Sequence, residues 1–310
     1  MTAPLAELAG KVAFITGGSS GIGLGIARAC REAGMNVAFT YRRTDHRDAA
    51  LAELSGKEDA VRAIELDVTD RDAFARAADG VTREFGGVHL LVCNAGVGIR
   101  AGAAEATFKD WDWALGVNLG GVINGITTFL PRLREQSPGA HIVATASTSG
   151  LVAGGKVGVY ITSKFAVVGL MESLRDELEG TNVGVSVFCP GFTRSNLIES
   201  EKHRPAALVN DVAKASTQPP TPEEESMMRK FMAVAMDPLE AGRRVLDGVR
   251  RNDLHILTHA EFDAPVRERA EALLAAFPAT KAPTARAATS RRFMTDLYAR
   301  ERTHREKTRE

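Results

Sequence analysis

The sequence predicts an α/β fold built on a doubly wound, seven-stranded parallel sheet with helices on both faces. Three observations predict it. Short segments rich in Val, Ile and Leu alternate with helical segments from Lys11 to His259. These short segments are apolar throughout, as expected for parallel strands that are covered on both sides. A glycine-rich turn, TGGSSGIG, joins the first strand to the first helix.

The strands are expected, in order, at residues 11–16, 36–42, 61–68, 88–96, 141–147, 182–191 and 253–259. Helices are expected between them at residues 25–34, 48–56, 71–87, 108–135 and 159–179, the first of which closes on a glycine. Two segments depart from this alternation. We interpret residues 192–236 as a lid insertion within a domain of residues 1–278, and residues 279–310 as a charged C-terminal extension.

Composition excludes several classes of function. The 310 residues include 39 Lys plus Arg and 39 Asp plus Glu, so the charge indicates no nucleic-acid partner. No uncharged apolar run approaches the length of a membrane span, and the N-terminus lacks the pattern of a signal peptide. The three cysteines, Cys30, Cys93 and Cys189, are far apart and form no metal or redox motif, which fits a cytoplasmic location.

The glycine-rich turn predicts a site for a dinucleotide. A glycine turn that opens a helix lets the backbone approach a pyrophosphate, whose charge the helix N-terminus favours. The spacing here is GxxxGxG and differs from the GxGxxG fingerprint. The candidate contacts in this turn are Gly17, Ser19, Ser20, Gly21, Ile22 and Gly23.

The stretch YITSK predicts catalysis. Tyr160 and Lys164 are four residues apart, so on a helix they share one face. A free phenol has a pKa near ~10, and a nearby ammonium favours its ionised form. Ser147 ends the preceding strand and can hydrogen-bond the same substrate oxygen as Tyr160. The alternative is an ordinary amphipathic helix with a packed Tyr and a solvated Lys.

Taken together, TGGSSGIG, NAG at 94–96, Asn118, Ser147, YITSK and PG at 190–191 resemble the short-chain dehydrogenase/reductase family over roughly residues 8–260. The resemblance implies a Rossmann-like fold and hydride transfer between a nicotinamide and a secondary alcohol or ketone. It implies that Asn118, Ser147, Tyr160 and Lys164 are catalytic, with Asn118 in a proton relay that reaches Lys164 through a water. No metal is expected, since His255 and His259 are poorly placed for one on a strand.

The resemblance also extends the cofactor site. It implies that Asp67 and Val68 lie beside the adenine, and that Asn94, Ala95 and Gly96 line the cleft. Tyr160 and Lys164 are implied to contact the cofactor as well. In the loop after the sixth strand, the implied contacts are Pro190, Gly191 and Ser195, and Thr193 is the alternative to Ser195 for the nicotinamide carboxamide.

The end of the second strand bears on the choice of nicotinamide. The acidic position that selects NAD in dinucleotide folds falls on Tyr41, and Arg42 and Arg43 follow. Guanidinium groups bind a 2′-phosphate well, so we expect NADP(H) and consider NAD(H) less favoured. Ser20 argues the other way, since many NADP-using relatives carry a basic residue there. The alternative is that both arginines are solvated surface charges.

The lid and its surroundings predict a hydrophobic substrate. Met228, Phe231, Met232 and Met236 fall near one helical face, and the segment after Ser147 is built of small residues. WDWALGVNLGGVINGITTFLPRL and SNLIESEKHRP are similar to the subgroup that includes bacterial dehydrogenases for the benzylic alcohol of lignin-type aryl ethers. Those relatives tend to be acidic where this chain has Tyr41. A bulky, apolar secondary alcohol or ketone, aromatic ones included, is therefore expected.

Two other functions stay open: a 3-oxoacyl-type reductase, and an NADP-binding sensor or scaffold without catalysis. A homodimer or homotetramer is expected because VNLGGVINGITTF offers small residues for close helix approach and KFAVVGLMESLRDEL is apolar on more than one face. In the tail, Phe293, Met294, Leu297 and Tyr298 would form one apolar helix edge, preceded by a linker, ATKAPTARAAT.

Overall fold

A computed structural model describes residues 4–54, 60–136, 139–210, 221–280, 283–291 and 294–308. The chain forms two compact units, which divide between Thr258 and His259. The first unit contains the whole sheet, and the second contains the C-terminal helices. The expected domain boundary after residue 278 stays a prediction.

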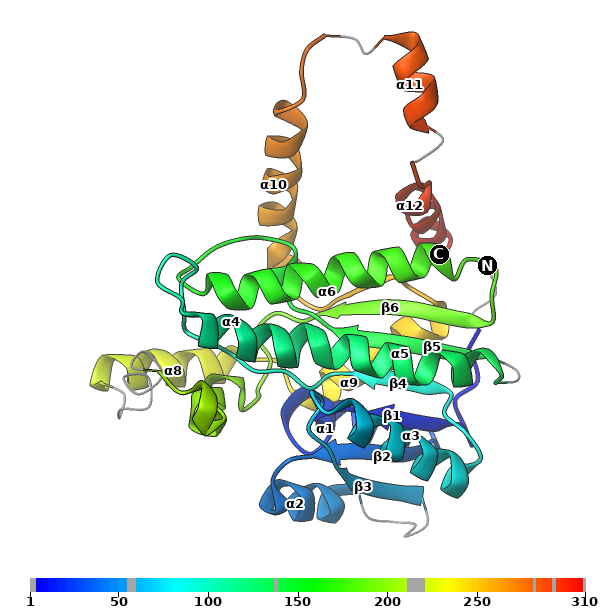
Figure 1. Cartoon of the computed structure of the whole chain (residues 1–310), viewed down its shortest axis with the longest axis vertical. Coiled ribbons are helices and arrows are strands. Elements are labelled where there is room, and N and C mark those ends of the chain that lie inside the picture. The colour runs from blue at the N-terminus through cyan, green and yellow to red at the C-terminus, as the bar shows by residue number, and fades with distance from the viewer. Residues whose placement is uncertain are drawn as a thin grey trace. The chain divides into compact units, whose positions relative to one another are not determined.

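One sheet of seven parallel strands forms the centre of the first unit, in the order β3-β2-β1-β4-β5-β6-β7 (Figure 1). The strands are β1 Val12–Ile15, β2 Asn36–Tyr41, β3 Val61–Glu65, β4 Leu90–Cys93, β5 Ala140–Thr145, β6 Val183–Cys189 and β7 His255–Leu257. The predicted fold is therefore confirmed. After β3 the chain returns to pair β4 with β1, which places the switch point of the sheet between these two strands.

Several strands are shorter than the sequence predicted. β3 ends at Glu65, β4 at Cys93 and β7 at Leu257. The predicted runs extended past these ends to Val68, Gly96 and His259, but in the structure the added residues leave the sheet as loops. The loops after β3 and β4 hold residues that were expected to contact the cofactor. The strand ends were therefore predicted incorrectly next to the expected cofactor site.

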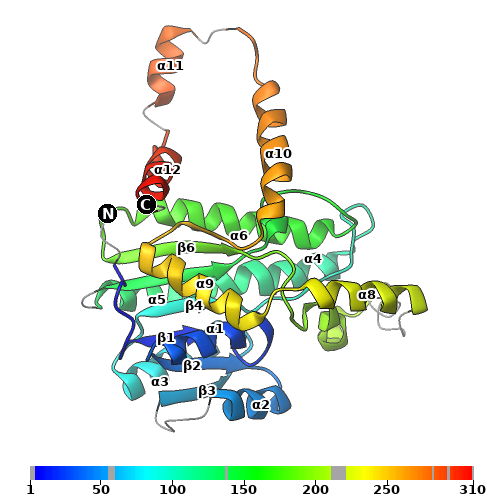
Figure 2. The same cartoon turned by 180° about the vertical axis from the view of Figure 1, so that it is seen from behind.

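Helices cover both faces of the sheet. α3 Arg71–Phe85, α4 Phe108–Leu115, α5 Gly121–Arg134 and α6 Gly158–Glu177 lie on the face seen in Figure 1. α1 Gly21–Glu32, α2 Thr44–Leu54 and α9 Pro238–Arg251 cover the other face (Figure 2). Phe14 and Phe129 pack with ring centroids 4.6 Å apart in the first of these two cores. Because helices bury both faces of the sheet, the strands carry apolar side chains on both faces.

The helix expected over residues 108–135 is interrupted, so that prediction was wrong in one respect. A π-helical segment, η2 Gly116–Gly120, separates α4 from α5. Such segments often occur at functional sites, and this one holds Asn118. The run Phe108–Arg134 is long and apolar enough to cross a membrane by composition, but half of its most apolar window is buried inside the fold. It therefore serves as a core helix here.

The two ends of the lid segment, residues 192–236, lie side by side. The segment contains η4 Leu197–His203, η5 Ala206–Leu208 and α8 Pro222–Val234. Thr193 and Met236 form an isolated parallel bridge, and the Met236 amide donates to the Phe192 carbonyl over 2.9 Å. Met236 thus lies beyond α8, so it is not part of the predicted helical stripe. The side chain of Met228 lies outside the described residues.

The second unit carries η6 Ala260–Phe262, α10 Asp263–Ala275, α11 Thr284–Arg291 and α12 Leu297–Thr308. α11 begins inside the stretch expected to be a linker, residues 279–289, so the second half of that stretch is helical. Met294 precedes α12, and Phe293 lies outside the described residues. The four residues predicted to form one helical edge therefore do not share one described helix.

Candidate active site and cofactor cleft

Tyr160, Lys164 and Ser147 meet beyond the end of β5. Tyr160 and Lys164 lie one turn apart on α6, and Ser147 lies two residues beyond the end of β5. The Ser147 hydroxyl hydrogen-bonds the Tyr160 phenol. Lys164 Nζ lies 5.6 Å from the centroid of the Tyr160 ring and donates to the Thr145 carbonyl over 3.0 Å. The structure thus brings together three of the four candidate catalytic residues in direct or near contact.

Burial dominates the ionisation of this pair. Burial raises the pKa of Tyr160 to about 12, although the hydrogen bond from Ser147 lowers it in part. Burial lowers the pKa of Lys164 to about 8. We expected Lys164 to favour the phenolate, but in the protein alone burial prevails and the pKa of Tyr160 is raised. The reason is that desolvation penalises both charged forms, and the ammonium makes its hydrogen bond to Thr145.

Asn118 is fully buried and joins the loop after β4 to the start of α6. Its Oδ1 accepts from the Val97 amide over 2.8 Å, and its Nδ2 donates to the Val97 carbonyl and to Ser163 Oγ, each over 3.0 Å. Ser163 Oγ in turn donates to the Tyr160 carbonyl over 2.7 Å. The side chain of Asn118 is therefore occupied in positioning the catalytic helix.

Sequence reasoning missed several supporting residues. Ser163 lies within YITSK itself, and Thr145 precedes Ser147 by two residues on the same strand end, so both were within reach of a motif argument. Cys189, for which the sequence indicated no metal or redox role, lies beside Ser147. Its thiol accepts a hydrogen bond from the backbone of Ser147, and burial raises its pKa to about 12, which keeps it neutral.

The Asn-Ala-Gly run at 94–96 holds the glycine turn against the sheet. Asn94 Nδ2 donates to the Thr16 and Gly17 carbonyls over 3.2 and 3.4 Å, and its Oδ1 accepts from Thr145 Oγ1 over 3.2 Å. The Ala95 amide donates to Thr16 Oγ1 over 3.0 Å. A Cβ on Gly96 would lie 3.2 Å from Asn118 Oδ1, so a side chain there would crowd the catalytic network.

The glycine turn itself fits a pyrophosphate. Gly17 and Gly21 have φ of +64° and +51°, a region that favours glycine. The N-cap Ser20 makes no side-chain capping bond and the first turn of α1 has no acidic residue, so this helix start suits an anion. Of the other predicted contacts, Ser19 is buried, Ile22 packs on the core, and Gly23 lies against the Gly17 carbonyl, where a side chain would clash.

The expected adenosine end of the cleft is rich in charge. Tyr41 packs under the Arg47 guanidinium, 5.4 Å from its ring centroid. Arg42 Nε lies 3.6 Å from Asp67 Oδ2. Arg43 forms an ion pair with Asp45.

Val68, beside Asp67, is buried. Its carbonyl accepts from Asn124 Nδ2 over 2.9 Å, and a Cβ on Gly121 would lie 2.7 Å from its side chain. Val68 therefore belongs to the core as well as to the expected adenine site.

The loop after β6 distinguishes Ser195 from Thr193. Pro190 accepts from the Thr148 amide over 3.0 Å, which ties this loop to the one after Ser147. Thr193 Oγ1 donates back to the Gly191 carbonyl over 3.4 Å. Ser195 instead lies against the glycine turn, where a Cβ on Gly21 would be 2.9 Å from Ser195 Cβ. Of the two candidates, Ser195 is the one that lies beside the glycine turn, and its contact with the nicotinamide carboxamide stays a prediction.

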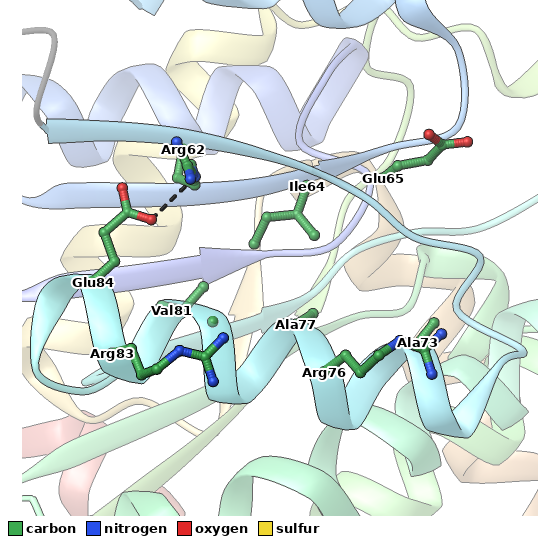
Figure 3. A pocket seen from close by; sticks show the side chains of 10 residues that line it. Arg62, Ile64, Glu65, Ala73, Arg76, Ala77, Val81, Arg83 and Glu84 are labelled. Carbon is green, nitrogen blue, oxygen red and sulfur yellow. Dashed lines mark ion pairs between the residues drawn. The ribbon is translucent and has the colours of Figure 1, made fainter.

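Two other features lie away from this site. A groove of about 460 Å³ runs between the edge strand β3 and α3 (Figure 3). It is lined by Arg62, Ile64, Glu65, Ala73, Arg76, Ala77, Gly80, Val81, Arg83 and Glu84, and holds none of the predicted site residues. His255 Nε2 lies 2.9 Å from Glu172 Oε1, whereas His259 belongs to the second unit.

Comparison with known proteins places this geometry in context. Residues 11–206 match the family described as short chain dehydrogenase. A C alpha-dehydrogenase from Sphingobium sp. strain NBRC 103272 / SYK-6 is 36% identical over 267 residues, which cover 85% of each chain. The apo form of LigO from Sphingobium sp. strain SYK-6 is 36% identical with a TM-score of 0.71, and the match covers 98% of both chains.

A short chain dehydrogenase/reductase from Burkholderia phymatum, solved in complex with NAD, is 32% identical with a TM-score of 0.78. The match covers 90% of this chain and 99% of that one. The resemblance stated from the motifs, including that to C alpha-dehydrogenases, is confirmed.

Proposed function

Because the chain belongs to the short-chain dehydrogenase family, it is an oxidoreductase that acts on CH–OH groups, and we propose that it transfers a hydride between NADP(H) and a bulky apolar secondary alcohol or ketone. The observation that carries the proposal is the junction of Ser147, Tyr160 and Lys164 at the end of β5. The glycine turn, joined to this end of the sheet through Asn94, completes it.

Each residue of the junction has a distinct task. The nicotinamide, when bound, supplies or accepts the hydride. Tyr160 exchanges a proton with the substrate oxygen; its raised pKa keeps that proton in place at neutral pH, ready for reduction of a ketone. Ser147 hydrogen-bonds the same oxygen. Lys164, whose pKa of about 8 leaves it mainly charged at neutral pH, stabilises the phenolate as it develops.

Asn118 acts in this scheme through its backbone. Its side chain is held by Val97 and Ser163. Because these bonds occupy the side chain, we assign the water that leads to Lys164 to the backbone carbonyl of Asn118, which lies in the π-helical segment. We therefore assign the side chain to positioning and the carbonyl to the proton relay.

NADP(H) is favoured by the residues that follow β2. Tyr41 provides no carboxylate to repel a 2′-phosphate, and Arg42 and Arg43 provide guanidinium groups. Each arginine is paired with an exposed carboxylate, Asp67 and Asp45, which a phosphate has to displace or share. The Burkholderia relative was solved in complex with NAD, which is an argument for NAD(H).

A bulky apolar substrate is favoured by the lid segment. Phe192, in the loop after β6, and Phe231 on α8 pack with ring centroids 5.1 Å apart, yet remain 54% and 40% exposed. Met232 is 41% exposed on the same helix. Exposed aromatic and Met side chains on the lid segment suit an apolar substrate, because Met side chains adapt to the shape of what they contact. Similarity to a C alpha-dehydrogenase agrees with a substrate whose alcohol lies next to an aromatic ring.

The test is an assay of the purified chain with NADPH and NADH against aryl ketones of increasing size and 3-oxoacyl thioesters. We expect turnover with NADPH and aryl ketones. Preference for NADH would overturn the cofactor assignment, and preference for the thioesters would make the chain a 3-oxoacyl reductase. Tight NADPH binding without turnover of any ketone would indicate a sensor.

We also propose a homodimer or homotetramer in the cytoplasm. The glycines of α5 do not support the assembly as we expected, because Gly121 and Gly125 face Val68 and Cys93 of the chain's own core. Ile123, 42% exposed on the outer side of α5, remains as support. The three cysteines are free and buried, as in a reducing compartment. A monomer by light scattering at micromolar concentration would refute the assembly.

A further inference from the structure

The first part of the lid segment spans the cofactor cleft from the glycine turn to the end of β2. Ser195 lies against Gly21, as described above. Farther along, Ser200 Oγ accepts from the Gly98 amide over 2.9 Å. His203 then reaches Arg43, with His203 Nε2 and an Arg43 guanidinium nitrogen 3.1 Å apart. A histidine of the lid thus lies beside an arginine that we assign to the 2′-phosphate.

The contact with Arg43 fixes the state of the imidazole. A guanidinium has only donors, so Nε2 of His203 must accept, and the ring is neutral with its proton on Nδ1. The surroundings agree: burial lowers the pKa of His203, and the charges of Arg43, His46 and Arg42 lower it further, while Glu199 raises it. In the protein alone, His203 is therefore a neutral side chain among cations.

The backbone at this point is held firmly. Arg204, the next residue, pairs with Asp110 over 2.7 Å, and both side chains are 1% exposed. The imidazole therefore starts from a fixed place at the cleft and needs no large rearrangement of the chain to meet a ligand held by Arg43.

From this arrangement we propose that His203 is part of the site for the 2′-phosphate of NADPH, and that the phosphate binds together with a proton. The inference rests on the proposed use of NADP(H). In the protein alone, Arg42 and Arg43 are each paired with a carboxylate, so the site lacks cationic charge for a dianion. When a phosphate approaches, Nε2 takes a proton from solution, releases Arg43 and donates to a phosphate oxygen. Arg43 then turns its guanidinium to the same phosphate.

A bound proton makes the affinity depend on pH. Where His203 is neutral in the free protein and charged in the complex, affinity for a 2′-phosphorylated ligand falls by up to about tenfold per unit of rising pH. The phosphate itself titrates near pH ~6, so measurements from pH 7.5 to 9 isolate the imidazole. A ligand without the 2′-phosphate should show no such dependence.

The experiment is calorimetric binding of adenosine 2′,5′-bisphosphate and of 5′-AMP to the full chain from pH 7.5 to 9. Pairs of buffers with different ionisation enthalpies give the number of protons taken up. We expect close to one extra proton for the bisphosphate and a 5- to 10-fold loss of its affinity in His203→Gln, with 5′-AMP unaffected. The matched variant His46→Gln, which changes the neighbouring imidazole, should keep the proton uptake.

The outcomes separate the inference from the proposed function. If wild type prefers the bisphosphate and Arg42→Ala abolishes that preference while His203→Gln leaves affinity and proton uptake unchanged, the role of His203 is overturned and NADP(H) stands. Loss of the uptake in His46→Gln but not in His203→Gln overturns the assignment to His203. Equal affinity of wild type for both ligands overturns the inference and the NADP(H) assignment together.

Discussion

The guanidinium of Arg204 donates a hydrogen bond of 2.7 Å to the carboxylate of Asp110, and both side chains are 1% exposed. Arg204 comes from the lid segment and also lies over the Trp113 ring, 4.6 Å from its centroid. Asp110 closes the capping box of α4 with Thr107. Burial alone would raise the pKa of Asp110, but hydrogen bonds from Thr107, Arg204 and Asn210 outweigh it and hold the pKa below its usual range. The lid is therefore tied to the core by a buried ion pair.

Arg204→Ala should lower the free energy of unfolding by about 3–5 kcal/mol, because it leaves the Asp110 carboxylate buried and unpaired. Arg194→Ala, which breaks the exposed pair with Asp237, should cost at most about 1 kcal/mol. Urea unfolding of both variants checks this. Equal small losses would mean that the buried pair contributes nothing to the fold.

Tyr160→Phe should lower turnover at least about 10²-fold, since it removes the hydroxyl that exchanges the proton and keeps the ring. Binding of NADPH, followed by its fluorescence, should be unchanged, because the ring still fills its partly buried place beside Lys164. Near-normal turnover in this variant would contradict the role assigned to Tyr160.

Arg42→Ala should weaken NADPH binding by roughly 1.5–3 kcal/mol, the scale for a charged hydrogen-bond partner, and leave NADH almost unchanged. Arg28→Ala is a matched control. Arg28, on α1, is exposed to a similar degree as Arg42 and pairs with Glu53 of α2 over 3.4 Å. Titration of each variant with both cofactors checks the result, and equal losses for NADPH and NADH would rule out contact with the 2′-phosphate.

His141 should make the fold sensitive to acid. It is fully buried on β5 and shares a hydrogen bond of 2.7 Å with Ser186. Burial lowers its pKa to about 3, and the charge of Arg175 adds to the shift. The ordinary pKa is about 6.5 in an unfolded chain. Below that pH the unfolded state binds a proton that the native state does not, so stability is full above pH ~6.5 and falls as the pH drops towards 3.

The expected slope from His141 is up to about 1.4 kcal/mol per pH unit. His141→Gln removes this group, so unfolding free energies measured in urea at steps from pH 7.5 to 5 should fall less steeply than in wild type. His89, whose pKa burial and Lys11 also lower, contributes to both proteins alike. Identical slopes in the two proteins would show that His141 does not resist protonation in the fold.

Truncation after Pro278 should leave a folded chain that binds NADPH, because the sheet and the glycine turn lie in the unit that ends at Thr258. We expect a changed KM for large ketones and unchanged kinetics for small ones, since the tail exposes the apolar residues Met294 and Tyr298. Wild-type kinetics on both sizes of ketone would make the tail a solvated extension.

The sequence by itself determined the sheet, the glycine turn and the catalytic motif. Runs of Val, Ile and Leu have to be buried on both faces, and the alternation with helices allows few other folds. Tyr160 and Lys164 share a face because a helix repeats every 3.6 residues, and that geometry is local. Such features depend on neighbours along the chain, so they could be predicted without the fold.

Only the tertiary structure decided the ionisation of the site and the path of the lid. The pKa of Tyr160 is raised because the surrounding fold removes water from the phenol, which no motif reports. Gly121 and Gly125 allow α5 to approach its own core, although the same residues would also suit a helix of a partner. His203 meets Arg43 across 160 residues of chain because the lid segment crosses the switch point of the sheet. Contacts of that kind arise from the path of the folded chain, and the spacing of residues in the sequence carries no record of them.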